Sequence, residues 1–197
     1  MLLSTITTPI IQKFQTAQWL PTILRRFDNQ TALLKDGTPV RLRQICSVDT
    51  RLICEIYTNM SASSRYLRFN TQLTDALCAE FAQQTAVQCE ESGFGLMAYV
   101  LDDSREDGIR PLGFAYYVQH GDELPEFAMS IIDACQRLGL GKILFKKLLK
   151  RAKKAGVASL QAYVLPNNMG MRMLIQRAGR PFFYGEEGSY ETYRIVV

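Results

Sequence analysis

Histidine is scarce in this 197-residue sequence, and its cysteines follow no ligand pattern. His120 is the one histidine, so an imidazole-based catalytic triad or a metal centre with several histidines has little to work with. Five cysteines occur, none in a C-x-x-C pair: Cys46, Cys54, Cys78, Cys89 and Cys135. An odd number without such a pair argues against a disulfide framework and a structural zinc site. We therefore expect no bound metal.

Long apolar runs and a strong net charge are also absent. No stretch of 18 apolar residues occurs, so we expect no transmembrane helix. The N-terminus lacks the basic segment of a secretory signal, which favours a cytoplasmic protein. The formal net charge of +4 is too small to predict nucleic-acid binding unless the cations cluster. With 47% hydrophobic and 21% charged residues, the chain has the composition of a soluble globular protein.

The sequence divides into a weakly patterned lead-in over residues 1–30 and one domain over residues 31–197. The lead-in contains the apolar residues of one short amphipathic helix before Pro21. From residue 31 the pattern sharpens. Residues 31–45 are predicted to form a β-hairpin, because Asp36-Gly37 supplies the positive φ that a tight turn needs.

The periodicities that follow predict helices and strands in the order of an α/β protein. Ser47 is expected to cap the first helix, with Asp49 in its first turn. The further helices are predicted over residues 61–69, 74–93, 141–155 and 168–178, and the strands over 94–102, 111–119, 124–132, 159–165, 181–186 and 189–196. An antiparallel meander followed by β-helix-β-helix-β gives a sheet with helices on both faces.

The most informative segment joins a strand to a basic amphipathic helix through Gln136-Arg137-Leu138-Gly139-Leu140-Gly141. Gly139 and Gly141 lack Cβ atoms, so the backbone can approach a ligand closely and its N–H groups can converge. The helix start adds unpaired N–H groups and the positive end of the helix dipole. Together these features predict an anion cradle suited to a pyrophosphate. The motif alone is explained equally well by a glycine turn that enters a core helix.

This strand, loop and helix resemble motif A of the GNAT superfamily of acyl-CoA-dependent N-acyltransferases, whose loop has the form Q/R-x-x-G-x-G. Downstream, Leu165-Pro166-Asn167-Asn168 matches the asparagine that opens the next helix of the superfamily. Upstream, the segments LLKDGTPVRLRQI, SASSRYLRF and PEFAMSI resemble the acetyltransferase domain of bacterial protein-lysine acetyltransferases. The resemblance spans about residues 31–180. It implies the GNAT fold, a mixed and mostly antiparallel central sheet of about six to seven strands with helices on both faces.

The resemblance also implies a catalytic base and a set of acetyl-CoA contacts. Glu126 occupies the place of a glutamate that takes the proton of the acceptor amine, and Glu123 is a neighbouring competitor. In this superfamily the strand before the loop splays from its neighbour, and its freed backbone binds the pantetheine arm like an added strand. An N–H group near Ser130 or Ile131 would polarise the thioester. The implied coenzyme-binding residues are Ser130, Ile131, Ile132, Gln136, Arg137, Leu138, Gly139, Leu140, Gly141, Lys142 and Asn168.

One position departs from the superfamily pattern. Many members have a tyrosine general acid seven residues after the asparagine, and this position is Ile175 here. Tyr163 and Tyr184 are candidate substitutes, although each is also explained as an ordinary strand aromatic. The general acid is therefore left unassigned. Asn168 itself suits the N-cap of the following helix as well as a coenzyme contact.

Three further features have a structural explanation beside a functional one. Cys135, next to the loop, would carry the acyl group in a ping-pong reaction, but core packing is the simpler explanation. The seven cations between Lys142 and Lys154 fit a solvated helix face better than a nucleic-acid site. Arg65 and Arg68 are placed either to line the acceptor side or to pair with acidic neighbours.

We therefore expect an N-acetyltransferase that moves an acetyl group from acetyl-CoA to a primary amine by direct transfer in a ternary complex. The subfamily resemblance favours a protein lysine as acceptor over a small amine. The alternatives are a small-molecule amine acetyltransferase and a non-catalytic acetyl-CoA-binding regulatory module. The expected partners are acetyl-CoA and the amine, without metal, nucleic acid or membrane.

Overall fold

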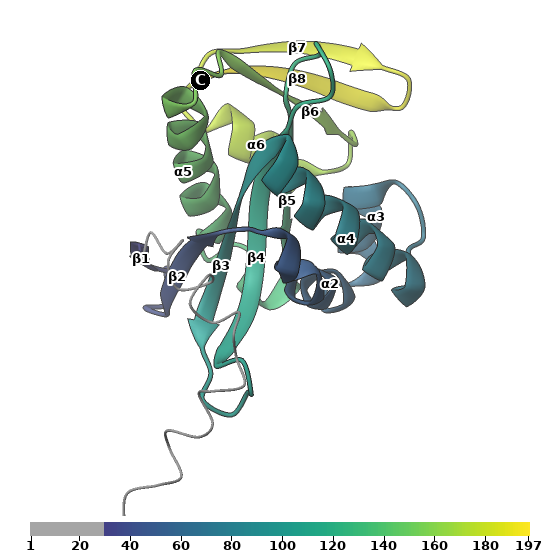
Figure 1. The fold of residues 1–197 in the computed structure, drawn as a ribbon. Coiled ribbons are helices and arrows are strands. Elements are labelled where there is room, and N and C mark those ends of the chain that lie inside the picture. Colours follow the sequence, from purple (N-terminus) through teal and green to yellow (C-terminus); the bar gives the residue numbers. More distant parts are fainter. Residues whose placement is uncertain (1–29) are drawn as a thin grey trace, which may run out of the picture.

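The structure, a computed structural model, describes residues 30–197 (Figure 1), so the helix expected in the lead-in lies outside the described residues. The strands are β1 (Gln30–Leu33), β2 (Pro39–Gln44), β3 (Gly93–Leu101), β4 (Ile109–Val118), β5 (Glu126–Ile131), β6 (Ser159–Val164), β7 (Phe182–Glu187) and β8 (Tyr190–Val196). The helices are α2 (Thr50–Thr58), α3 (Ala62–Phe69), α4 (Asp75–Glu91), α5 (Leu140–Lys154) and α6 (Met169–Gln176), with 3-10 turns η2 (Ser47–Asp49) and η3 (Asp133–Cys135).

All eight strands of the described chain join one sheet in the order β1-β2-β3-β4-β5-β6-β8-β7. Every neighbouring pair is antiparallel except β5 and β6, which are parallel and are connected through the crossover helix α5. The predicted mixed, mostly antiparallel sheet is thus confirmed. It has one strand more than the six to seven expected, because the hairpins at both ends of the domain join the same sheet.

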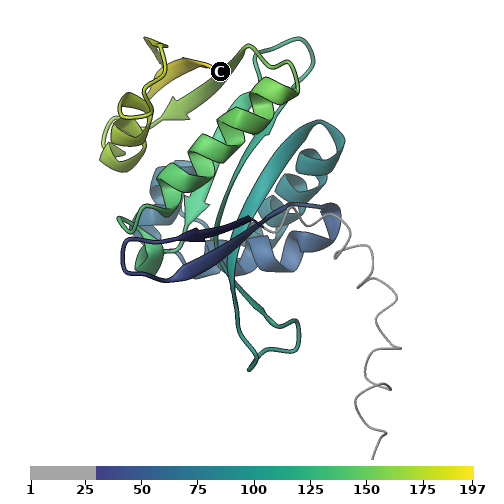
Figure 2. The same ribbon diagram turned by 90° about the vertical axis from the view of Figure 1, so that its left-hand side faces the viewer.

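Helices cover both faces of the sheet, as predicted. Figure 2 shows α5 in front of the sheet and the α2–α4 group behind it. Leu144 and Leu148 of α5 lie in one hydrophobic core, and Ile53 of α2 lies in the other. Phe127 belongs to the first core and its neighbour Ala128 to the second, so β5 is buried between the two layers. Within residues 30–197, the helices are too short or too polar to cross a membrane.

The start of the first helix differs from the prediction. Ser47 does not cap it: η2 comes first, with Cys46 as its N-cap, and α2 begins at Thr50. The Asp49 carboxylate is buried, where it accepts hydrogen bonds from the Cys46 N–H (2.9 Å) and from both terminal nitrogens of Arg43 (2.6 Å each). A buried guanidinium needs a carboxylate partner, so Asp49 turns inward and the helix start follows it.

Most other element ends agree with the pattern. The Thr74 side chain caps α4 by accepting from the N–H of Leu77. Helix α5 begins at Leu140, one residue earlier than predicted. Strand β5 begins at Glu126 instead of residue 124, directly after Pro125, which has no N–H to contribute to a ladder.

Replacement of Arg43 by methionine should lower the free energy of unfolding by about 3–5 kcal/mol, because it leaves the Asp49 carboxylate buried without its counter-charge. Arg51→Met is the matched control. The Arg51 side chain is 64% exposed, and its ion pairs with Asp107 and Glu55 lie at the surface, so a loss below about 1 kcal/mol is expected. Urea unfolding followed by circular dichroism measures both. Equal losses would contradict the role given to the buried pair.

Candidate active site

The parallel pair of β5 and β6 forms a fork in the sheet. Their ladder consists of one register pair, Glu126 with Gln161, and the Gln161 N–H also donates to the carbonyl of Pro125 at 2.8 Å. Beyond this pair the two strands are not joined, although β5 continues to Ile131. An unpaired strand edge binds an extended ligand in the manner of an added strand. The splayed strand implied by the sequence is present.

The ladder between β4 and β5 decides which backbone groups of β5 face the opening of the fork. The N–H of Ile132 donates to the Leu112 carbonyl at 3.0 Å, on the β4 side. Because these groups alternate along an antiparallel ladder, Ser130 also turns its N–H toward β4, whereas Met129 and Ile131 face the opening. Of Ser130, Ile131 and Ile132, the contacts that the resemblance implies in this segment, only Ile131 directs its N–H into the fork. The N–H of Met129, at the start of the matching segment, also faces the opening.

The loop after β5 contains two residues with positive φ, Arg137 (61°) and Gly139 (93°). Such a conformation is uncommon for arginine. N–H groups converge in turns of this kind and form a concavity that binds anions. The carbonyl of Leu138 accepts from the N–H of Lys35 at 3.0 Å, so the turn between β1 and β2 holds the loop from outside. The loop is thus a fixed backbone turn, and the binding of an anion by it stays a prediction.

Helix α5 extends this cradle. By helix geometry the N–H groups of its first turn have no acceptor within the helix. The Ile143 N–H donates to the carbonyl of Gly139 at 3.2 Å, so the groups before it, at Leu140–Lys142, are free of the helical ladder. Leu140 is buried and anchors the helix start, whereas Lys142 is exposed. The positive end of the helix dipole therefore meets the loop.

The two glycines of the loop have different structural roles. Gly139 has a φ of 93°, at which an L side chain is strained. Gly141 is helical, and a Cβ there would lie 3.5 Å from the Met129 Sδ and the Ile131 Cδ1, which is ordinary contact. The backbone conformation therefore requires glycine at 139, whereas neither conformation nor packing requires it at 141. The space left by Gly141 borders the side chains of β5 beside the fork.

Asp133 and Gln136 fasten the loop to α3. The Asp133 carboxylate accepts from the N–H and hydroxyl of Ser61 and from the hydroxyl of Ser64, each at 2.8 Å. Partial burial works to raise the pKa of Asp133, but these hydrogen bonds outweigh it and lower the pKa. The Gln136 side-chain amide donates to the carbonyl of Ile131 and to Ser64 Oγ, at 3.2 Å each. Gln136 thus holds the loop in place.

Asn168 lies after β6 and caps α6. Its Oδ1 accepts from the N–H of Met171 at 3.1 Å, which confirms the predicted N-cap. The backbone N–H of Asn168 donates to the carbonyl of Leu165 at 2.8 Å. Within residues 30–197 the side-chain nitrogen of Asn168 makes no hydrogen bond, so a donor is left for a ligand. The coenzyme contact of Asn168 stays a prediction.

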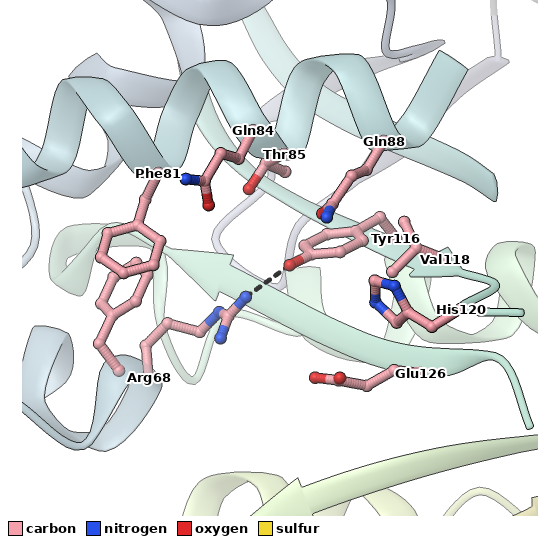
Figure 3. A pocket seen from close by; sticks show the side chains of 10 residues that line it. Arg68, Phe81, Gln84, Thr85, Gln88, Tyr116, Val118, His120 and Glu126 are labelled. Atoms are coloured by element: carbon pink, nitrogen blue, oxygen red, sulfur yellow. Dashed lines mark hydrogen bonds between the residues drawn. The ribbon is translucent and has the colours of Figure 1, made fainter. Parts of the chain in front are cut away.

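A cavity of about 160 Å³ lies beside Glu126, between β4, β5 and the helices α3 and α4 (Figure 3). Figure 3 shows the carboxylate of Glu126 and the guanidinium of Arg68 directed into this space. Glu123, the competing carboxylate, is exposed on the preceding loop and does not line the cavity. The other polar lining comes from Gln84, Thr85, Gln88, Tyr116 and His120.

Arg68 and Tyr116 set the electrostatics of this cavity. The Arg68 Nη2 donates to the Tyr116 hydroxyl at 2.6 Å. Burial works to lower the pKa of Arg68, but Tyr116, Tyr57 and Glu126 raise it above its ordinary value, so the guanidinium stays charged. Burial also raises the pKa of Tyr116, so the phenol stays protonated at neutral pH. The cavity therefore contains a fixed cation beside a neutral hydroxyl.

The α4 residues that line the cavity are not among the site residues predicted from the sequence. Gln84 and Gln88 lie four residues apart on α4, a spacing that also describes a solvated helix face. Thr85 between them is buried, and its hydroxyl lies 3.2 Å from that of Tyr57. A helix face that lines a polar cavity and one that faces water have the same pattern of polar residues, so the sequence does not distinguish them.

The residues considered for the general acid and for an acyl-cysteine are packed in the core or hydrogen-bonded to neighbouring side chains. Ile175 is buried in the core beneath α6. Tyr163 on β6 accepts a hydrogen bond from a glutamine on the same strand, and Tyr184 on β7 donates to Glu186 at 2.9 Å. Cys135 is half-buried, and this burial raises the pKa of its thiol. A raised pKa disfavours the thiolate that an acyl-cysteine mechanism requires.

Gly139→Ala should lower the free energy of unfolding by about 1–2 kcal/mol, because the alanine Cβ is strained at this φ. Gly141→Ala should leave it unchanged or raise it by up to about 1 kcal/mol, since alanine is the better helix former. Denaturant unfolding of both variants measures the difference. A similar loss at both positions would show that packing, and not the space for a ligand, accounts for Gly141.

Asp133→Asn should lower the stability at neutral pH, and this loss should disappear in acid. Because the folded-state pKa of Asp133 is lowered, its contribution is fully present above the unfolded-state pKa of about 3.9 and is lost as the pH falls through the folded-state value. The difference in melting temperature between parent and variant should be constant above about pH 5 and shrink below about pH 4. A difference that stays constant in acid would show that the carboxylate charge is not involved.

Comparisons with known proteins agree with this architecture. An acetyltransferase from Pseudomonas aeruginosa is 24% identical over 170 residues, which cover 86% of this chain and 88% of that protein. The solved GNAT domain of S. lividans PAT has a TM-score of 0.71 at 22% identity, covering 85% of this chain and 96% of that domain. The PaiA N-acetyltransferase from Thermoplasma acidophilum, solved in complex with coenzyme A, has a TM-score of 0.60 at 15% identity, covering 80% of this chain and 99% of that one.

These structural likenesses, at low identity, show the fold. The family itself is shown by a sequence match over residues 40–180 to the family described as the acetyltransferase (GNAT) domain. This range includes the fork, the loop and the cavity. The chain therefore belongs to the GNAT acetyltransferase family.

Proposed function

We propose that this protein transfers an acetyl group from acetyl-CoA to a primary amine, directly and within a ternary complex. The observation that carries the proposal is the position of Glu126. This residue lies where β5 leaves β6, lines the cavity, and begins the strand that leads to the anion cradle. A donor bound along the cradle and the opening of the fork would thus meet an amine in the cavity at Glu126.

The described residues suit the parts of acetyl-CoA by charge and shape. The N–H groups of Arg137–Gly139 and of Leu140–Lys142 would hold the pyrophosphate, aided by the helix dipole. The N–H groups of Met129 and Ile131 would bind the pantetheine arm, and the Asn168 side chain has a donor left for it. The space at Gly141 leaves room beside β5. When bound, acetyl-CoA supplies the acetyl group as a thioester.

Glu126 would serve as the base that makes the acceptor nucleophilic. An amine with a pKa near 10.4 is neutral in only about one part in 10³ at pH 7. A carboxylate in the cavity, acting directly or through a water, takes the proton from the nitrogen and restores its lone pair. Direct attack on the thioester is favoured over an acyl-cysteine because burial raises the pKa of the Cys135 thiol.

The leaving group needs less assistance than the amine. A thiol has a pKa of about 8.5, so a thiolate can leave near neutral pH without a dedicated acid. The core position of Ile175, where the superfamily pattern often has a tyrosine general acid, is consistent with this difference. The N–H of Ile131, which faces the opening, is the donor best placed to polarise a thioester oxygen.

One experiment separates the proposed transfer from its alternatives. Calorimetry with acetyl-CoA is followed by thiol release in the presence of either a pool of small amines or a lysine-containing protein mixture. Amine-dependent release supports transfer, and the two acceptor arms separate small amines from the protein lysine favoured by the sequence. Tight binding without release would point to a regulatory module. No binding at millimolar acetyl-CoA would overturn the proposal.

Glu126→Gln should lower kcat by about 10²–10⁴-fold, the usual contribution of a general base, while the dissociation constant of acetyl-CoA changes less than about twofold. Glu123→Gln is the matched control, because this carboxylate is three residues away, exposed and outside the cavity. Steady-state kinetics and calorimetry on both variants measure the two quantities. An unchanged kcat in Glu126→Gln would remove Glu126 from the role of base.

A further inference from the structure

Arg68 differs from the other arginines that are withdrawn from solvent. Among residues 30–197, four other arginines are buried or half-buried, and each has a carboxylate oxygen within 4.0 Å: Arg43, Arg65, Arg105 and Arg172. Arg68 is half-buried and has no such ion pair in this part of the chain. A charge removed from water without a counter-charge is costly. Arg68 is therefore set up for an anion that the described chain does not provide.

The contacts of Arg68 hold its side chain without neutralising it. Its guanidinium donates to the Tyr116 hydroxyl and lies 4.9 Å from the ring centre of Phe69. Neither partner carries a negative charge, because the Tyr116 phenol stays protonated. The Arg68 Nε is buried and has no hydrogen-bond partner among the described residues. Figure 3 shows the guanidinium directed into the cavity, on the side that faces Glu126.

The cavity thus presents one cation and one carboxylate to whatever occupies it. Arg68 and Glu126 interact electrostatically, yet no oxygen of Glu126 lies within 4.0 Å of an Arg68 nitrogen. The complementary ligand carries an amine and an anion a few bonds apart. At about 160 Å³ the cavity is smaller than the roughly 300–1,000 Å³ of sites for drug-sized ligands, which suits a small molecule.

We propose that the acceptor is a small amine that carries a carboxylate, of the amino acid class, with its carboxylate on Arg68 and its amine at Glu126. This inference rests on the proposed acetyl transfer. A guanidinium binds a planar carboxylate through paired N–H groups, which fixes the orientation of the amine as well as its affinity. Phe69 and Phe81 supply an apolar wall for the remainder of the molecule.

The chemistry in this arrangement balances without a further reactant. The proton of the ammonium group passes to Glu126 or to a water beside it. The freed nitrogen forms an N–C bond to the acetyl carbon while the C–S bond breaks, and its second proton passes to solvent water as the amide forms. The electron pair of the C–S bond leaves with the thiolate of CoA. Arg68 touches only the carboxylate, so it positions the acceptor and takes no proton.

The experiment compares each L-amino acid with its own α-carboxamide, which keeps the amine and side chain but lacks the negative charge. For the preferred side chain, kcat/KM should be about 10–100-fold higher for the acid, the usual effect of a hydrogen bond to a charged group. Removing the carboxylate also lowers the pKa of the amine, which by itself favours the carboxamide. A measured preference for the acid therefore underestimates the contribution of the carboxylate.

Variants of Arg68 assign this preference to the guanidinium. Arg68→Gln should bring the ratio of acid to carboxamide close to one, mainly through KM, and Arg68→Lys should retain part of it. Arg65→Gln, on the same helix and paired with Asp75 instead, should leave the ratio unchanged. Circular dichroism and thermal unfolding establish that each variant is folded. If Arg68→Gln does not fold, Arg68→Lys carries the test.

Two outcomes would overturn the inference: equal use of acid and carboxamide by the parent, and an unchanged ratio in a folded Arg68 variant. Acetylation of proteins without turnover of any amino acid would also overturn it. If no amine causes thiol release from acetyl-CoA, the proposed transfer fails. Calorimetry with the same acid and carboxamide pairs then tests whether Arg68 binds the carboxylate. Arg68-dependent preference for the acid in binding would keep the carboxylate site, and equal binding would remove it.

Discussion

The separation of β5 from β6 is the constraint on which the rest of the site depends. These strands are the parallel pair of the sheet, and their ladder holds only at Glu126 and Gln161. If the ladder continued, the N–H groups of Met129 and Ile131 would be used within the sheet, and a donor would have no strand edge to bind. The same separation leaves Glu126 at the end of the paired region, next to the cavity. One interrupted ladder thus creates the opening and places the carboxylate beside it.

An opening of this kind is useful only if the loop beyond it keeps its shape. The loop is held by the β1–β2 turn through Lys35, by α3 through Asp133, and by the Gln136 side chain. Because these contacts use side chains and carbonyl oxygens, the N–H groups of Arg137–Gly139 make no backbone hydrogen bond within the described residues, as the proposed anion site requires. Donors fixed before the ligand arrives bind it without the cost of being ordered at that moment. The positive φ of Arg137 is the local strain that this fixed turn retains.

The sequence predicted the parts that depend on local chemistry. The apolar periodicity of α5 and the alternation in the strands each lie within one segment, so the prediction of these elements is confirmed. The misses depend on contacts between segments. Ser47 fails as a cap because Arg43, on a strand, draws Asp49 into the core. The direction of the Ser130 N–H follows from the phase of the β4 ladder, which the sequence of β5 does not contain. The α4 wall is polar, and only packing shows that it lines a cavity.

In the proposed acetyl transfer, the attacking amine is harder to deprotonate than the leaving thiol. The charged residues of the site lie on the side proposed for the amine. A thiolate leaves with a pKa near 8.5, whereas an amine must lose a proton held with a pKa near 10.4. The structure packs Ile175 into the core on the α6 side and places two charged groups, Glu126 and Arg68, in the cavity on the α3–α4 side. A carboxylate alone would bind the protonated, unreactive amine as well as accept its proton. In the proposed reaction, a second charge that holds the acceptor elsewhere on the molecule would let Glu126 release the amine for attack. Under this proposal, the Arg68 guanidinium and the Glu126 carboxylate, which line the same cavity, would act together in binding and deprotonating the acceptor.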